Sequence, residues 1–182
     1  LGTTVAVLPY RHPLHVARVA ANIDRFTGGR FVLGVGVGWS AAEYGALGVP
    51  FAQRGAITDE YLAAITAAWT TDVVSLQGRY VDYRDVSTGP RPARTPHPPI
   101  WVGGSSPAAI RRAVRFGDAW HPINPDPAWL RDVGVPALER AADAEGRPVP
   151  ALATRIRTRL TPGDLPAGDR RAVFCRLEHI VP

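Results

Sequence analysis

Residues 99–117 carry the pattern of a buried strand, a glycine turn and a capped helix. Residues 99–102 are short, apolar and partly β-branched or aromatic, as in a strand that is buried on both faces of a sheet. The pair Gly103–Gly104 then allows the backbone to turn sharply and to approach a ligand closely. Ser106 suits the N-cap of the next helix, a proline follows at its first position, and Gly117 ends it. This succession constrains the chain to an α/β fold.

The junction between this strand and this helix has the groups of an anion site. Free backbone N–H groups at a helix start, together with the positive end of the helix dipole, attract negative charge. The hydroxyls of Ser105 and Ser106 add two further donors. The pattern predicts a phosphate cradle, although the same residues also suit a purely structural turn, and both interpretations stay open at this point.

Strands and helices alternate along the chain. We expect strands at 1–8, 30–35, 99–102, 118–122 and 151–160. We expect helices at 13–27, 57–69, 107–116 and 126–145. Alternation without consecutive strands implies parallel pairing with right-handed crossovers, in a β/α barrel or a doubly wound sheet. Chemically distinctive residues just after the strands favour a barrel whose active face lies at the carboxyl ends of the strands.

Local patterns add detail to this outline. A β-hairpin is expected at about 73–86, and a long loop runs from Trp39 to about Gly55. The helix at 126–145 is expected to be interrupted near Gly134 and Pro136. The inward face of the helix at 13–27 is expected to consist of Val16, Val19, Ala20, Ile23 and Phe26.

The length and composition predict one incomplete domain. A chain of 182 residues with 46% apolar content can bury a single sizeable core. A whole barrel takes about 250 residues, so residues 1–160 are expected to form a partial barrel, with 161–182 as an irregular tail. The chain has no Met and opens on residues that read as a core strand, which indicates a fragment.

Composition also disfavours several classes of function. No apolar run approaches the ~20 residues of a membrane helix, and no signal peptide is visible, so we predict a cytoplasmic protein without a membrane partner. The lone Cys175 excludes an internal disulfide and a cysteine zinc site, and no His/Asp/Glu cluster indicates another metal. The net charge is +5, but the basic residues are all Arg and are spread along the chain, which disfavours nucleic-acid binding.

Four blocks, at 1–13, 28–39, 98–106 and 117–120, together resemble the bacterial luciferase-like oxidoreductases, particularly the branch that uses the deazaflavin coenzyme F420. The resemblance extends over residues 1 to about 160. It implies a luciferase-like TIM (β/α)8 barrel, here without its first two strands and its final strand. It also implies that flavin or deazaflavin binds at the carboxyl ends of the strands, and that the full-length protein is a homodimer.

The resemblance assigns expected roles to particular residues. It implies a cofactor phosphate at Gly103, Gly104, Ser105 and Ser106, and a non-prolyl cis peptide at Thr4–Val5 behind the cofactor ring. It implies that Gly36, Val37 and Gly38 line the cofactor and substrate cavity. Two departures from the family's sequence pattern make two of its activities, sugar-phosphate dehydrogenation and light emission, unexpected for this chain. Trp39 stands where the sugar-phosphate dehydrogenases have an acidic residue, and Gly36–Val37 stand where luciferases have Cys-Arg.

Three residues are candidates for contact with substrate or cofactor. His121 lies at the end of a predicted strand and faces the predicted active side. Trp39 either closes the cavity or covers core, and His12 either contacts the cofactor or merely caps a helix. Glu43 and Tyr44 are expected in a mobile lid.

The function predicted from these observations is hydride transfer between F420 and a small organic substrate, with the cofactor performing most of the chemistry. The first alternative is an FMN-dependent monooxygenase of the same fold. The second is a truncated barrel without catalytic activity.

Overall fold

The computed structural model describes the backbone of residues 1–156, 158–161 and 173–176, and the side chains of 1–156. A five-stranded parallel sheet lies at its centre, in the order β1-β2-β5-β6-β7. These strands are Ala6–Val7, Leu33–Gly36, Ile100–Gly103, Ala119–His121 and Ala151–Leu152. The strands follow chain order without a reversal, as in a barrel and unlike a doubly wound sheet.

The strands at the two sides of this sheet are shorter than predicted. The strand expected at 1–8 pairs only through an isolated Gly2–Val32 bridge and through β1, and Leu8–Tyr10 forms a 3₁₀ turn. The strand expected at 151–160 is divided into β7 and β8, Thr158–Thr161, and β8 pairs in parallel with β9, Val173–Arg176. The rest of the predicted tail lies outside the described residues.

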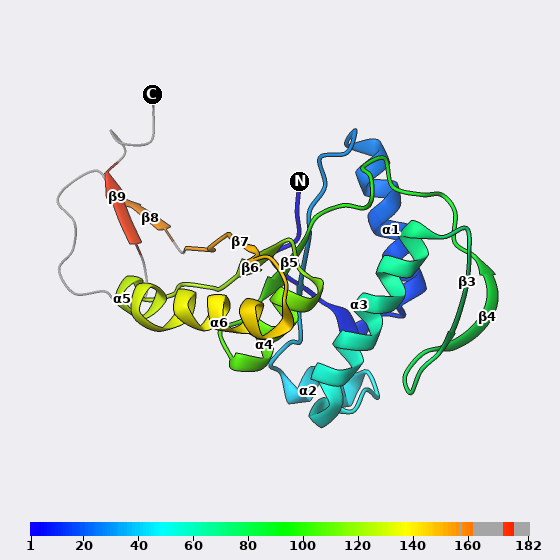
Figure 1. The fold of residues 1–182 in the computed structure, drawn as a ribbon, viewed down its shortest axis with the longest axis horizontal. Coiled ribbons are helices and arrows are strands. Elements are labelled where there is room, and N and C mark those ends of the chain that lie inside the picture. Colours follow the sequence, from blue (N-terminus) through cyan, green and yellow to red (C-terminus); the bar gives the residue numbers. More distant parts are fainter. Residues whose placement is uncertain (157, 162–172, 177–182) are drawn as a thin grey trace.

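Helices cover the sheet in two pairs (Figure 1). α1 (Pro13–Phe26) packs on α3 (Arg54–Thr70), and α4 (Pro107–Phe116) packs on α6 (Val135–Glu145). The side chains of each strand point alternately to the two faces of the sheet, and those on the face beneath the helices form the core. The buried strand residues of this core are Leu33, Val35, Ile100, Val102 and Trp120. The opposite face of the same strands therefore carries Gly34, Gly36, Trp101, Gly103 and His121.

α4 forms as predicted. It spans Pro107–Phe116, and the Ser106 hydroxyl oxygen accepts a hydrogen bond from the N–H of Ala109 at 3.2 Å. The N–H of Gly117 donates to the carbonyl oxygen of Ala113 at 2.9 Å and ends the helix. The capping residues were sufficient to predict the two ends of α4 because each of these hydrogen bonds joins residues within about one helical turn.

The prediction for the buried face of α1 is correct for Ala20, which is buried, and for Val16 and Ile23, which pack against the core, but it is wrong for Val19 and Phe26. The buried residues of this helix include Ala17, Ala20, Ala21 and Asp24, whereas Phe26 is 91% exposed. The indole Nε1 of Trp69 in α3 donates to the carbonyl oxygen of Ala17 at 2.9 Å. The small side chains of α1 therefore face α3, and its larger apolar residues are rotated away from that contact.

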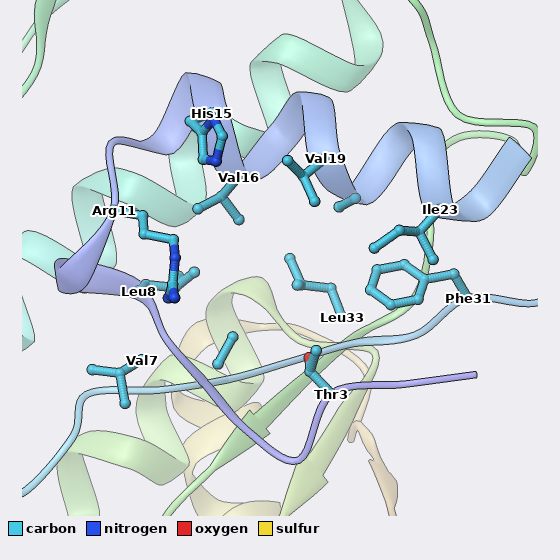
Figure 2. A pocket seen from close by; sticks show the side chains of 12 residues that line it. Thr3, Val7, Leu8, Arg11, His15, Val16, Val19, Ile23, Phe31 and Leu33 are labelled. Atoms are coloured by element: carbon cyan, nitrogen blue, oxygen red, sulfur yellow. The ribbon is translucent and has the colours of Figure 1, made fainter. Parts of the chain in front are cut away.

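Those larger residues line an apolar groove between α1 and the sheet. Figure 2 shows Val16, Val19 and Ile23 pointing from α1 toward Leu33 and Phe31. The groove has a volume of about 180 Å³ and is open to solvent. The apolar periodicity of the sequence thus identified a real apolar stripe, but one that the described residues leave partly uncovered.

The segment predicted as a loop up to Gly55 contains two helical turns. α2 spans Ala41–Ala46, with the Ser40 hydroxyl as its N-cap acceptor, and Phe51–Gln53 form a 3₁₀ turn. Tyr44 is fully buried, and its hydroxyl donates to the carbonyl oxygen of Val37 at 2.6 Å. Tyr44 is therefore part of the core, and the prediction of a mobile lid is wrong for this residue.

The burial of Tyr44 predicts a loss of stability in alkali. Burial raises the pKa of Tyr44 to about 12, and the nearby Tyr10 adds to the rise while Arg54 opposes it. An unfolded tyrosine titrates near pH ~10. The stabilisation is therefore complete below about pH 10 and is lost as the pH rises through about 12. Denaturant titrations across this window should show a smaller decline in the free energy of unfolding for Tyr44→Phe. An unchanged decline contradicts this prediction.

The predicted β-hairpin is confirmed, as β3 (Val73–Gln77) and β4 (Asp82–Ser87) in antiparallel pairing. It lies beyond α1 and α3 in Figure 1. The Glu60 carboxylate of α3 accepts hydrogen bonds from three successive N–H groups of its turn, at 3.1, 2.8 and 2.6 Å. These groups belong to Arg79, Tyr80 and Val81. One carboxylate therefore attaches the hairpin to the helix.

Glu60→Ala is expected to loosen this turn. Hydrogen bonds to a charged group contribute about 1.5–3 kcal/mol, so amide exchange at residues 79–81 should accelerate at least tenfold. Glu139→Ala is the matched control, because Glu139 is exposed on α6 and bonds to no described side chain. Equal exchange rates at 79–81 in wild type and Glu60→Ala contradict the prediction.

The helix expected at 126–145 is continuous rather than interrupted. α5 (Pro127–Trp129) leads through a π-helical turn, Leu130–Gly134, into α6. Pro136 has no N–H for the carbonyl four residues earlier, and the N–H of Val135 instead donates to Leu130, five residues earlier. The π-helical turn thus accommodates the missing N–H of Pro136, and the helix continues where the proline predicts an interruption. Among the described residues, no helix is long and apolar enough to cross a bilayer.

Candidate functional site

The carboxyl ends of two neighbouring strands, β2 and β5, are glycines. Gly36 ends β2 and Gly103 ends β5, and Val5 covers both. A Cβ at Gly36 would lie 2.7 Å from Val5 Cγ2, and one at Gly103 would lie 3.0 Å from Val5 Cγ1. The peptide bond between Thr4 and Val5 is cis, as the resemblance implied. The sheet therefore presents an apolar surface at this edge, with Val5 outermost.

The predicted phosphate cradle lies next to this surface, at the start of α4. Gly104 has φ +108°, a conformation that strongly favours glycine. The Ser106 hydroxyl oxygen is the N-cap acceptor of α4. Ser105 is exposed and has no hydrogen bond with the described residues. Its hydroxyl and its N–H are thus available to a ligand.

The segment after β2 follows the same edge. The Val37 carbonyl oxygen is occupied by the Tyr44 hydroxyl, and Gly38 has φ +68° with its Cα close to Val7 and Tyr44. Trp39 is 86% exposed, so it does not cover core. Its alternative role, closing the cofactor cavity, stays a prediction.

His121 is buried on the same face of the sheet as the glycines. Its Nδ1 bonds to the carbonyl oxygen of Ala153, and its Nε2 lies 2.8 Å from the hydroxyl of Thr4. A carbonyl only accepts, so this network assigns the proton to Nδ1, and Nε2 accepts from Thr4. The imidazole therefore links Thr4, β6 and the segment after β7.

A cavity of about 520 Å³ opens beside His121. Thr4, Trp101 and Arg155 contribute to its walls, and Arg155 Nη1 donates to the Thr4 carbonyl oxygen at 3.2 Å. The Trp101 and His121 rings lie 5.5 Å apart. Thr4 is thus held through its hydroxyl by His121 and through its carbonyl by Arg155.

His12 is a helix cap. Its Nδ1 accepts the N–H of Leu14 at 3.3 Å, as the structural alternative in the sequence analysis anticipated. It lines a separate hollow between α1 and the end of β4, together with Val86 and Thr88. Within the described part of the chain, no three His, Cys, Asp or Glu side chains are arranged to hold a metal ion.

Two contacts of this site were not foreseen. Trp120 donates from its indole N–H to the Gly104 carbonyl oxygen at 2.7 Å, and Arg155 reaches Thr4 across 151 residues of sequence. The alternation of β6 could have identified Trp120 as a core residue, but not its bond. No local signal distinguishes Arg155 from the other arginines.

One protein family matches almost the whole chain. The family described as luciferase-like monooxygenase matches residues 1–175. The FMNH(2)-dependent dimethylsulfone monooxygenase of Pseudomonas putida is 37% identical over 128 residues, which are 68% of this chain and 35% of that protein.

Solved structures support the same fold. The monooxygenase RslO1 from Streptomyces bottropensis superposes with a TM-score of 0.78 at 24% identity. An F420-dependent secondary alcohol dehydrogenase, solved with an F420-acetone adduct, superposes with a TM-score of 0.79 at 23% identity. Each covers 88% of this chain, and this chain covers 50% of each. The parallel sheet and its helices are thus part of a luciferase-like TIM barrel, and the chain spans half or less of the length of these relatives.

Proposed function

Because the chain belongs to the luciferase-like monooxygenase family, we propose that it binds a flavin or deazaflavin at the glycine surface and takes part in an oxidoreductase reaction on a small organic substrate. The observation that carries this proposal is the joint presence of an apolar surface at Val5, Gly36 and Gly103 and the start of a capped helix beside it. A planar ring system and a phosphate are the two parts of such a cofactor.

The residues present fit this group. Val5 packs over both glycines and leaves no room for a side chain at either, so a ring would lie against Val5. Ser105 and Ser106 stand at the N-terminus of a ten-residue helix, where the dipole favours a phosphate. Thr4, Val5, Gly36, Val37 and Gly38 would contact the ring side of the cofactor, and Gly103, Gly104, Ser105 and Ser106 the phosphate.

This chain's own contribution is position and electrostatics. When bound, the cofactor supplies the redox chemistry: hydride transfer for F420, or oxygen activation for reduced FMN. His121 and Arg155 hold Thr4 from two sides, which fixes the backbone that carries Val5. The buried apolar surface excludes water from one side of the ring.

The finer proposal is hydride transfer with F420 and an organic substrate. The similarity in fold to the F420-dependent secondary alcohol dehydrogenase supports it. The FMN-dependent alternative is supported by the 37% identity to the FMNH(2)-dependent dimethylsulfone monooxygenase. Oxygen dependence separates the two, because the deazaflavin does not readily form an oxygen adduct.

The test is a titration of the 182-residue chain with F420 and with FMN, followed by cofactor fluorescence. Gly104→Glu and Ser105→Asp place a carboxylate in the cradle and should each weaken binding at least about tenfold, by repulsion of the phosphate. Ser87→Asp, on exposed β4, is the matched control and should leave binding unchanged. Preference for FMN moves the assignment to the monooxygenase alternative, and binding of neither cofactor to the folded chain contradicts the proposal.

A further inference from the structure

We propose that Trp120 is a positioning residue for the phosphate cradle: its indole N–H holds the Gly104 carbonyl oxygen and so keeps this acceptor turned away from a phosphate at the start of α4. This inference rests on the proposed function and adds a residue that the cradle motif itself does not contain. Trp120 is fully buried, so it would not touch a ligand directly. It acts through the backbone of Gly104.

The indole is fixed at both ends. Trp120 lies in β6, where it pairs with Val102 of β5, and its side chain is fully buried. The far edge of its ring lies against the π-helical turn, because a Cβ on Gly134 would come within 2.9 Å of Trp120 Cη2. The Trp129 ring lies 6.1 Å away. The indole N–H thus has one direction available, toward Gly104.

The start of α4 offers several N–H donors beside the Gly104 carbonyl. Ser106 is the N-cap, so Ala108 is at the second helical position, where an N–H has no acceptor within the helix. Within the described residues the N–H of Ala108 has no other acceptor, and the Gly104 carbonyl accepts from Trp120 at 2.7 Å. The N–H groups of Ser105 and Ser106 also lack one within the same residues. Three exposed N–H groups therefore remain for an anion.

The same bond removes a repulsive group. A carbonyl oxygen that turned toward the cradle would face the phosphate with its negative end. Trp120 draws this oxygen into the interior, and Gly104, at φ +108°, permits the peptide orientation that results. Trp120 thereby removes an acceptor from an anion site whose remaining groups are N–H donors.

Trp120→Phe tests the inference, because phenylalanine retains an aromatic ring and lacks the N–H. We expect the dissociation constant for FMN to rise about tenfold, while that for riboflavin, which has the same ring without the phosphate, stays within about twofold. Trp129→Phe alters the adjacent aromatic ring without touching Gly104, and its FMN-to-riboflavin ratio should equal that of wild type. An equal loss for both ligands, or no loss for either, overturns the role of Trp120.

A measurement on the wild-type chain keeps the inference falsifiable if Trp120→Phe does not fold. Inorganic phosphate, added to the isotopically labelled protein, should shift the amide resonances of Ser105, Ser106 and Ala108 and the Trp120 indole N–H resonance together. Phosphate that moves none of the three amides overturns the inference. If these amides respond while neither FMN nor riboflavin binds, the cofactor assignment fails and the cradle stands.

Discussion

Gly34→Ala is expected to lower the free energy of unfolding by about 4 kcal/mol or more, a value reserved for severe backbone conflicts. An added Cβ at Gly34 would lie 1.9 Å from the carbonyl oxygen of Thr3 and 3.0 Å from its carbonyl carbon. Both atoms belong to backbone, so no side-chain rotation relieves the collision. The Thr3 hydroxyl also donates to the Gly34 carbonyl oxygen at 2.7 Å, and the displacement would break that bond.

This loss is large compared with the ~5–15 kcal/mol that stabilises a typical domain. Denaturant unfolding, followed by tryptophan fluorescence, measures it directly. Gly45→Ala in α2 is the matched control, because no atom lies within 4 Å of its added Cβ and alanine favours helix. We expect Gly45→Ala to be neutral or slightly stabilising. A wild-type midpoint for Gly34→Ala would show that the first segment separates from β2 at little cost.

The elements that were predicted from sequence are those whose signals are local. α4 was predicted with both of its caps, because the Ser106 and Gly117 bonds span three or four residues. The parallel order of the sheet followed from the alternation of strands and helices, since crossovers of this kind have one preferred hand.

The errors concern contacts that only the tertiary structure creates. The periodicity of α1 could not show that Trp69, 52 residues later, would select the alanine face of the helix. α2 is six residues long and gains its stability from the burial of Tyr44 rather than from helix propensity. Pro136 correctly predicted an irregularity in the helix, but the irregularity is a π-helical turn rather than an interruption.

In the candidate site, too, local sequence signals could be predicted and long-range contacts could not. The glycine turn and the serines of the cradle are contiguous in sequence, so a motif could identify them. The bonds that hold them join residues far apart: Trp120 to Gly104 across 16 positions, and His121 to Thr4 across 117. Such bonds depend on which strands become neighbours, and residue types alone do not contain that information.

The attachment of the cradle helix α4 to α3 is the basis of the second large prediction. Arg112 of α4 is 7% exposed, and its guanidinium bonds to the Asp59 carboxylate at 2.5 and 3.3 Å and to the Gly55 carbonyl oxygen at 3.1 Å. Asp59→Ala leaves a buried cation without its partner, which costs about 3–5 kcal/mol. The lower end applies here, because the Asp59 side chain is 40% exposed and water partly replaces the lost carboxylate.

Asp72→Ala is the control that distinguishes the cost of leaving a buried charge unpaired from the cost of losing an exposed ion pair. Asp72 pairs with Arg91 at 2.8 Å, but the two side chains are 87% and 45% exposed, so its loss should change the free energy of unfolding by less than ~1 kcal/mol. Asp59→Leu combined with Arg112→Leu should recover most of the stability, because no unpaired charge then remains buried. If Asp59→Ala costs no more than Asp72→Ala, the guanidinium of Arg112 has moved to solvent. Because α4 carries Ser106 at its start, the cradle would then have lost its fixed position relative to α3.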